Sequence, residues 1–379
     1  MVAFLKQLII KTYPKSENIK EFKFMIRISK EVFRRIFLIG FIFASVFLVL
    51  PSCNSGIDIR IGQENAIWTQ SIFLRGFQPS TLQRLTDDDI FEYAKTLKQY
   101  NIKYAYLFAG PFNKNGYLPH YAFSDTAVNT VKLLRKFYPE IIILPWVGGI
   151  QNKTVYLDDS IWVRNALTDS KNLIKTLSVT GLHFDFEFIV KGDSLLERTV
   201  LEGGSGDSAS YGYNVNEFHR KFRKLMPDAF VSSVVVATSP GTKPWKRKTS
   251  LDELKVLIHY VDQLSFLFYD TQINSQVEFE DNCTYLIKDI QNLKQSERIL
   301  KVQYLIALGT FINEPELQKY RNMDIENIPN TLETLKECLL AVNSNEQIVD
   351  GIAIFCEWET DMLEWNQIYN HWTNQKVLR

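Results

Sequence analysis

The sequence has few of the residues that support metal, nucleotide or nucleic-acid chemistry. Its 379 residues include only five histidines and four cysteines, and no two histidines have the His-x-His or His-x-x-x-His spacing of a metal-binding pair. No glycine-rich phosphate loop follows an apolar run. The 43 basic and 43 acidic residues balance, so no basic surface for nucleic acid is expected. The sequence therefore predicts a protein that uses no cofactor or metal and has no nucleic-acid partner.

The first 53 residues differ from the rest in charge and hydropathy. They hold nine of the basic and three of the acidic residues, which leaves the remainder with a net charge of −6. The apolar run 36–50 follows several basic residues. It is shorter than the roughly 20 residues of a membrane span and is typical of a signal-peptide core. It ends in Leu-Pro-Ser-Cys, which resembles a bacterial lipoprotein cleavage site, with Cys53 as the residue that is lipid-modified.

These features predict how the chain is divided. A second methionine, Met25, precedes the basic and apolar leader and is interpreted as the true start. Because Pro51 is unusual at such a cleavage site, an uncleaved anchor helix is the alternative. The mature protein is then expected to be a monomer in the cell envelope, held to a membrane by lipid on Cys53. The predicted segments are an upstream stretch 1–24, a signal segment 25–53, a linker 54–65 and one folded domain 66–379.

After the linker, apolar strand-like runs alternate with amphipathic helical segments, an order that predicts a parallel sheet with crossover helices. The expected strands are 66–74, 102–109, 141–147, 179–188, 230–237, 261–269, 302–308 and 351–356. The expected helices are 86–100, 124–137, 161–177, 214–226, 250–260, 281–294 and 332–342. Eight strand–helix units over about 310 residues favour a (β/α)8 barrel. A doubly wound open sheet is the alternative. The three cysteines of this region are expected to be ordinary buried thiols.

The fourth expected strand is the most informative part of the sequence. At the period of a strand, residues 182–188 place four apolar side chains on one face. The other face carries three ionisable groups, His183, Asp185 and Glu187. Ionisable groups inside a buried sheet are costly to desolvate and therefore indicate chemistry; a solvated edge strand is the alternative. In a barrel, Asp185 and Glu187 would lie at the C-terminal strand end, where active sites are built.

This strand resembles the fourth-strand signature of family 18 glycoside hydrolases, Asp-Gly-x-Asp-x-Asp-x-Glu. Asp185 and Glu187 match its last two acidic positions, whereas Thr180 and His183 replace the first two. The resemblance implies that Glu187 is the general acid/base and that Asp185 holds the substrate's N-acetyl group. His183 could pair with Asp185 as a cation and hold it ionised, or it could be a hydrogen-bonded core residue.

Three other strand ends resemble the same family. The sixth expected strand ends in Leu-x-Tyr-Asp, similar to Met-x-Tyr-Asp, which implies that Tyr269 stabilises an oxazolinium-like intermediate. Trp146 replaces the Ser of a Ser-x-Gly-Gly motif, and Phe355 replaces the Trp that floors the sugar site. The resemblance thus implies substrate-binding roles for His183, Asp270, Trp146, Phe355 and Trp358.

Asp185 and Glu187 cannot flank a glycosidic bond, because they are two residues apart on one strand. A substrate-assisted mechanism removes this conflict, since the sugar's acetamido oxygen is then the nucleophile. The sequence predicts a retaining hydrolase of β-linked N-acetylglucosamine glycans. One alternative is a non-catalytic carbohydrate-binding lipoprotein that keeps the barrel. Another is a barrel glycosidase or deacetylase of a different family, with a second carboxylate about 5–9.5 Å from Glu187; the candidates are Asp270, Glu357 and Glu359.

Overall fold

The computed structural model describes most of the chain after the leader. The described residues are 59–60, 62–188, 208–237, 248–297, 299–310, 321–342, 347–375 and 377–378, and all belong to the unit Ile57–Arg379. The predicted upstream stretch 1–24 and signal segment 25–53, including Cys53, lie outside the described residues. Within the described ranges, no helix has both the length and the apolar character needed to cross a membrane.

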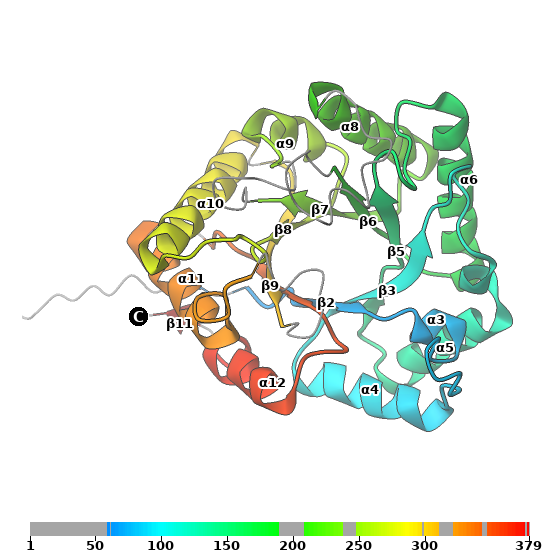
Figure 1. The fold of residues 1–379 in the computed structure, drawn as a ribbon, viewed down its shortest axis with the longest axis horizontal. Helices are drawn as coiled ribbons and strands as arrows, with labels where there is room; N and C mark the ends of the chain where they lie inside the picture. The colour runs from blue at the N-terminus through cyan, green and yellow to red at the C-terminus, as the bar shows by residue number, and fades with distance from the viewer. Residues whose placement is uncertain are drawn as a thin grey trace, which may run out of the picture. The chain divides into compact units, whose positions relative to one another are not determined.

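Parallel strands close into a barrel surrounded by helices (Figure 1). The strand order is β2–β10–β9–β8–β7–β6–β5–β3, and β2 pairs back with β3 to close the ring. The predicted (β/α)8 barrel is thus confirmed, and the open sheet is excluded. The strands are β2 (Ala66–Thr69), β3 (Tyr104–Pro111), β4 (Ile142–Ile143), β5 (Trp146–Ile150), β6 (Gly181–Glu187), β7 (Phe230–Val236), β8 (Gln263–Leu267), β9 (Gln303–Gly309) and β10 (Gly351–Phe355).

The helices form the outer ring of Figure 1 and follow the strands as expected for crossover connections. Local sequence fixes several of their starts. In the first long helix, for example, the Thr86 side chain accepts a hydrogen bond from the Asp89 backbone N–H, and the Asp89 carboxylate accepts one from Thr86. The helices are α3 (Ile72–Arg75), α4 (Asp87–Gln99), α5 (Asp125–Phe137), α6 (Ser160–Leu177), α8 (Ser208–Leu225), α9 (Leu251–Leu257), α10 (Gln276–Ser296), α11 (Ile328–Val342) and α12 (Met362–Ile368).

The two faces of β6 enter two different layers of the core. Leu182, Phe184 and Phe186 belong to the layer between the sheet and the helices. There the ring of Phe184 meets the rings of Phe218 and Phe222 on α8 edge-on, at centroid distances of 5.4 and 4.9 Å. The helical cover predicted for this apolar face is therefore confirmed, and the ionisable face points into the barrel.

The predicted strands 66–74, 141–147 and 261–269 differ from the observed ones, and the helices predicted to begin at 214, 281 and 332 begin earlier, at Ser208, Gln276 and Ile328. The first strand ends at Thr69 rather than 74, because the following apolar residues form the short helix α3, which buries Phe73 and Leu74. An apolar run this short does not distinguish a strand from a buried helix. The third strand is interrupted between β4 and β5, where Pro145 has no N–H for the ladder. The sixth strand ends at Leu267, two residues before Tyr269.

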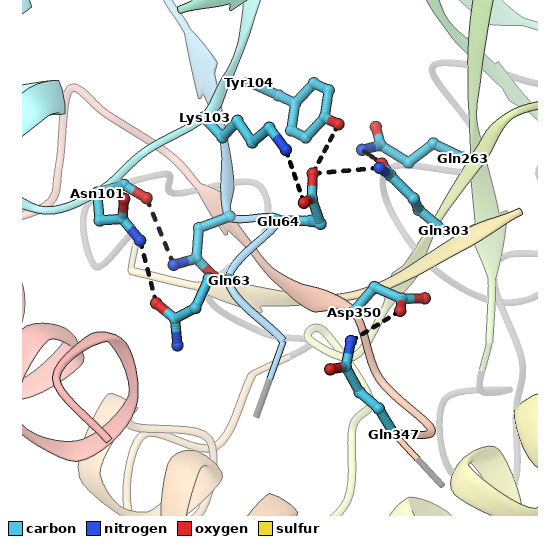
Figure 2. Close-up of polar contacts among 10 residues, drawn as sticks. Gln63, Glu64, Asn101, Lys103, Tyr104, Gln263, Gln303, Gln347 and Asp350 are labelled. Carbon is cyan, nitrogen blue, oxygen red and sulfur yellow. Dashed lines mark hydrogen bonds and ion pairs between the residues drawn. The ribbon is translucent and has the colours of Figure 1, made fainter. Parts of the chain in front are cut away.

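Part of the predicted linker 54–65 belongs to the fold. β1 (Ile59–Arg60) pairs antiparallel with β11 (Val377–Leu378) near the end of the chain. Glu64 accepts hydrogen bonds from Lys103, Tyr104 and Gln303 at the N-terminal end of the barrel (Figure 2). Polar composition made these residues look like a linker, but the backbone of 59–60 pairs with β11 and the Glu64 side chain is bonded to the barrel.

Candidate active site

Asp185 and Glu187 lie half-buried at the C-terminal end of β6, on its interior face. Their strand is held close to β5, with Gly148 opposite Asp185. A Cβ atom on Gly148 would lie 1.9 Å from the Asp185 carbonyl oxygen, so only glycine fits this approach. The Trp146 indole Nε1–H donates a hydrogen bond of 3.1 Å to Asp185 Oδ2. The Trp-Val-Gly-Gly sequence of β5 therefore positions Asp185.

Tyr269 lies just beyond β8, close to both carboxyl groups. Burial raises the pKa of its phenol well above the ordinary value, and the negative charges of Asp270, Asp185 and Glu187 raise it further. The hydroxyl therefore stays protonated and can donate a hydrogen bond. The structure thus brings together the three residues predicted to be catalytic, although they come from strands separated in sequence by more than 80 positions.

Aromatic rings form a floor beside these groups. The Phe355 ring lies parallel to the Tyr269 ring, with centroids 5.2 Å apart and 9° between the planes. The Trp358 ring meets Phe355 edge-on at 5.6 Å, and the Trp68 ring does so at 5.8 Å. Phe355 thus occupies the centre of the aromatic group and is joined to the next residue by a cis peptide bond.

A cavity of about 420 Å³ opens at the C-terminal ends of β2, β3 and β5. Its walls include the aromatic rings of Phe108, Trp146 and Trp358 and the amide side chains of Gln70 and Gln78. Flat aromatic faces and amide groups suit a ligand that has apolar ring faces and many hydroxyl groups. Trp146 connects the cavity to the acidic pair, because its indole also bonds Asp185.

His183 is fully buried in the barrel, below Asp185. Its ring stacks on Tyr106 with centroids 3.7 Å apart, and its two nitrogens bond Trp68 and Ser232. Burial lowers the pKa of His183 well below its usual value. His183 is therefore a neutral, hydrogen-bonded core residue rather than a cation paired with Asp185. The predicted contact between His183 and substrate has no support in this geometry.

The carboxylates considered as a second catalytic acid lie in different surroundings. Asp270 is almost fully buried, and its charge interacts with Arg321. Glu357 lines a second cavity of about 440 Å³, together with Phe73 of α3 and Asp89 of α4. Burial raises the pKa of Glu357 to about 7. Glu359 is half-buried. Within the described ranges, no group of three or more His, Cys, Asp or Glu residues is arranged to hold a metal ion.

Several residues of the site were not found by sequence reasoning. Trp68 and Phe108 come from strands for which no motif was recognised, and both contribute rings beside the acidic pair. Arg321 and Glu326 form a buried polar cluster behind Asp270, in which burial raises the pKa of Glu326 to about 7. The expected strands in 66–74 and 102–109 could have shown the two aromatic residues at inward positions, but no sequence pattern marked Arg321 or Glu326.

No protein-family model matches the sequence, and no curated protein sequence matches it. The structure is similar to solved structures over most of its length. The spore cortex-lytic enzyme SleL of Bacillus cereus is 10% identical, with a TM-score of 0.53 over 83% of this chain and 75% of SleL. A chitinase from Bacteroides thetaiotaomicron is 10% identical (TM-score 0.52, 84% and 97% of the two chains). A chitinase from Rhizomucor miehei is 12% identical (TM-score 0.51, 82% and 99%). The likeness establishes the fold.

Proposed function

We propose that this protein is a retaining glycoside hydrolase that cleaves β-linked N-acetylglucosamine glycans with the help of the substrate's acetamido group. The observation that carries the proposal is the grouping of Asp185, Glu187 and Tyr269 beside an aromatic floor, at the C-terminal end of the barrel. Two solved structures with this fold are described as chitinases, and a third as a spore cortex-lytic enzyme. Both descriptions agree with a glycan as substrate.

The proposed reaction uses one acid/base and one orienting carboxylate. Glu187 gives its proton to the glycosidic oxygen as the bond to the anomeric carbon breaks, while the acetamido oxygen attacks that carbon. Asp185, fixed by Trp146, accepts the acetamide N–H, and the Tyr269 hydroxyl donates to the acetamide oxygen. Glu187 then takes a proton from a water molecule, which attacks the anomeric carbon and opens the cyclic intermediate. The two successive displacements at this carbon retain the anomeric configuration.

The surroundings of the other carboxylates support acetamido assistance over a two-carboxylate mechanism. Glu357 lines the cavity on the α3 and α4 side, and Asp270 interacts with Arg321 in a buried cluster. Asp185 is on the same strand as Glu187, so the two approach the sugar from the same side. An internal nucleophile supplies the missing partner on the opposite side of the anomeric carbon.

The proposal is tested by hydrolysis of fluorogenic N-acetylglucosamine oligomers by the wild type and by Glu187→Gln, which keeps the shape and removes the acid. We expect turnover to fall by about 10²–10⁴-fold. Glu333→Gln on α11, where the side chain is 60% exposed, is the matched control and should keep full activity. Turnover that survives in Glu187→Gln would exclude Glu187 as the acid. If the wild type binds the oligomers without hydrolysing them, the protein is the carbohydrate-binding alternative.

We also propose that the protein is an exported, monomeric lipoprotein anchored through Cys53, a proposal that the sequence of the leader supports. In a bacterial host, Cys53→Ala should move the protein from the membrane fraction to the soluble fraction and abolish incorporation of labelled fatty acid. Continued labelling of the variant would show that the lipid is attached elsewhere, and membrane retention without label would favour the uncleaved anchor helix.

A further inference from the structure

A line of polar side chains runs through the interior of the barrel, where bulky apolar residues are usual. His183, Ser232 and Gln263 are each fully buried on three neighbouring strands. Buried polar groups are costly unless they are hydrogen-bonded. Here each of them has partners, so the interior contains a satisfied polar chain below the acidic pair.

This series of hydrogen bonds begins at Trp68 on β2, at the end nearest the acidic pair. The Trp68 Nε1–H donates to His183 Nε2 at 3.1 Å. The other ring nitrogen, His183 Nδ1, lies 2.7 Å from Ser232 Oγ. Ser232 in turn donates to Gln263 Oε1 at 2.8 Å, an oxygen that also accepts from the Tyr106 hydroxyl at 2.6 Å.

The lower part of the chain ends at the N-terminal mouth of the barrel, as Figure 2 shows. Gln263 donates its amide N–H to Gln303 Oε1 at 2.9 Å, and Gln303 donates to Glu64 Oε2 at 3.1 Å. Glu64 also accepts from the Tyr104 hydroxyl at 2.8 Å and forms an ion pair of 2.6 Å with Lys103. The series of hydrogen bonds therefore ends at the carboxylate of Glu64.

The two ends fix the direction of every bond between them. An indole N–H can only donate, and a carboxylate in an ion pair can only accept. Because His183 Nε2 accepts from Trp68, its proton must be on Nδ1, from which it donates to Ser232. If the proton were on Nε2 instead, the Nε2–H would face the Trp68 N–H, and two donors would meet without an acceptor. Both ends thus select the same neutral tautomer of His183.

We propose that His183 is a positioning residue of the glycosidase site, held as its neutral Nδ1–H tautomer so that Nε2 fixes the Trp68 indole beneath Phe355. This inference rests on the proposed function. The Trp68 ring meets the rings of His183 and Phe355 edge-on, at 5.2 and 5.8 Å. Phe355 in turn stacks on Tyr269. His183 therefore acts through Trp68 on the aromatic floor and on Tyr269, the proposed hydrogen-bond donor to the acetamide oxygen.

Two substitutions separate the halves of the His183 interaction. In His183→Gln, the side-chain oxygen can reach as far as Nε2 and accept from Trp68, but the bond to Ser232 is lost. In His183→Asn, the shorter amide can replace Nδ1–H as donor to Ser232, but it does not reach Trp68. Both lose the stack on Tyr106, so their stabilities should fall to a similar extent. The two variants therefore each keep one of the two bonds, and a loss of kcat seen only in His183→Asn is assigned to the bond to Trp68.

We expect His183→Gln to keep kcat within a few-fold of the wild type and His183→Asn to lose about 10- to 100-fold in kcat, the scale of a small displacement of catalytic groups. Equal losses in the two variants, or a larger loss in His183→Gln, would overturn the proposal. If His183→Asn does not fold, Trp68→Phe removes the same donor while keeping a ring, and should show the same loss of kcat.

NMR of the protein gives a readout that is independent of turnover. The Trp68 indole proton should be protected from exchange in the wild type and in His183→Gln, and exposed to exchange in His183→Asn. The ¹⁵N shifts of His183 should show a protonated Nδ1 and an unprotonated Nε2. The opposite tautomer would overturn the proposal even in an active enzyme. If the wild type hydrolyses no oligomer, the proposed function fails, and oligomer affinity in the same variants then decides whether His183 positions the floor.

Discussion

The two faces of strand β6 show how one strand serves stability and chemistry with alternate residues. Outward, Leu182, Phe184 and Phe186 pack against the helices, where apolar area is removed from water. Inward, His183 is held by hydrogen bonds to Trp68 and Ser232 and by a ring contact with Tyr106, and Asp185 accepts a hydrogen bond from Trp146 on the neighbouring strand. Substitutions on the outward face are expected to lower stability and to leave turnover unchanged. The inward face depends on the geometry of particular atoms.

The largest combined effect on stability and turnover is expected from Gly148→Ala, because the close approach of β5 and β6 at this position supports both faces of β6. Gly148→Ala places a Cβ atom against the backbone of β6, so β5 and β6 must move apart. We expect the free energy of unfolding to fall by more than about 3 kcal/mol and turnover to be lost even in the folded fraction. Chemical denaturation and oligomer hydrolysis measure the two quantities. A stable, active variant would show that the strands do not need this close approach.

A change on the outward face should cost stability alone. Phe184→Ala removes a fully buried ring that contacts Phe218 and Phe222, and we expect a loss of about 3–5 kcal/mol. Phe184→Leu is the control and should lose less, because it leaves a smaller cavity. Turnover per folded molecule, measured well below the unfolding temperature, should equal that of the wild type in both variants. A lower kcat would mean that the outward layer also positions the acidic pair.

The helix α8, which packs on the outward face of β6, contains a pH-sensitive group, His219. Burial lowers the pKa of His219 to about 4 from the ordinary value of 6.5, and its Nδ1 bonds the Val215 carbonyl. The unfolded chain therefore binds this proton below about pH 6.5, whereas the folded chain does not until about pH 4. Stability is lost as the pH falls through this window, by about 3 kcal/mol in total.

This dependence is isolated by comparing the wild type with His219→Asn, which keeps a donor to Val215 and removes the titration. The wild type also contains buried His183 and several glutamates with raised pKa values, such as Glu326, but these groups are present in both proteins. We expect the free-energy advantage of the wild type at pH 7 to shrink by about 3 kcal/mol at pH 4. An advantage that does not change with pH would show that His219 is not the titrating group.

The smallest expected effect on stability comes from Tyr269, which lies just beyond β8 and close to the inward-facing acidic pair. Tyr269→Phe removes one hydroxyl and keeps the ring that stacks on Phe355. We expect the free energy of unfolding to change by about 1 kcal/mol or less, while kcat falls by about 10²-fold, as for loss of one donor to a developing charge. Tyr285→Phe on α10, 65% exposed, is the control and should change neither quantity. An unchanged kcat in Tyr269→Phe would remove the hydroxyl from the proposed mechanism.

Local sequence determined much of this protein. Strict alternation in residues 182–187 is a property of the strand period, so it predicted which side chains of β6 meet the helices and which enter the barrel. The repeated order of apolar runs and amphipathic segments predicted the barrel, and barrel geometry then placed Asp185 and Glu187 at the end where sites are built. The acidic run 87–89 similarly indicated the start of α4, where the structure shows a capping box between Thr86 and Asp89.

Only the tertiary structure decided what each inward residue contacts. The hydrogen-bond partners of His183 are Trp68, 115 positions away, and Ser232, and the ring stacked on Tyr269 is Phe355. The cavity that Glu357 lines likewise depends on Phe73 of α3, a short helix that the apolar run concealed. The strand period predicts which way a side chain points, but which strands face each other depends on the closure of the barrel. Hydrogen bonds across that interior, and the protonation of His183 with them, exist only after closure.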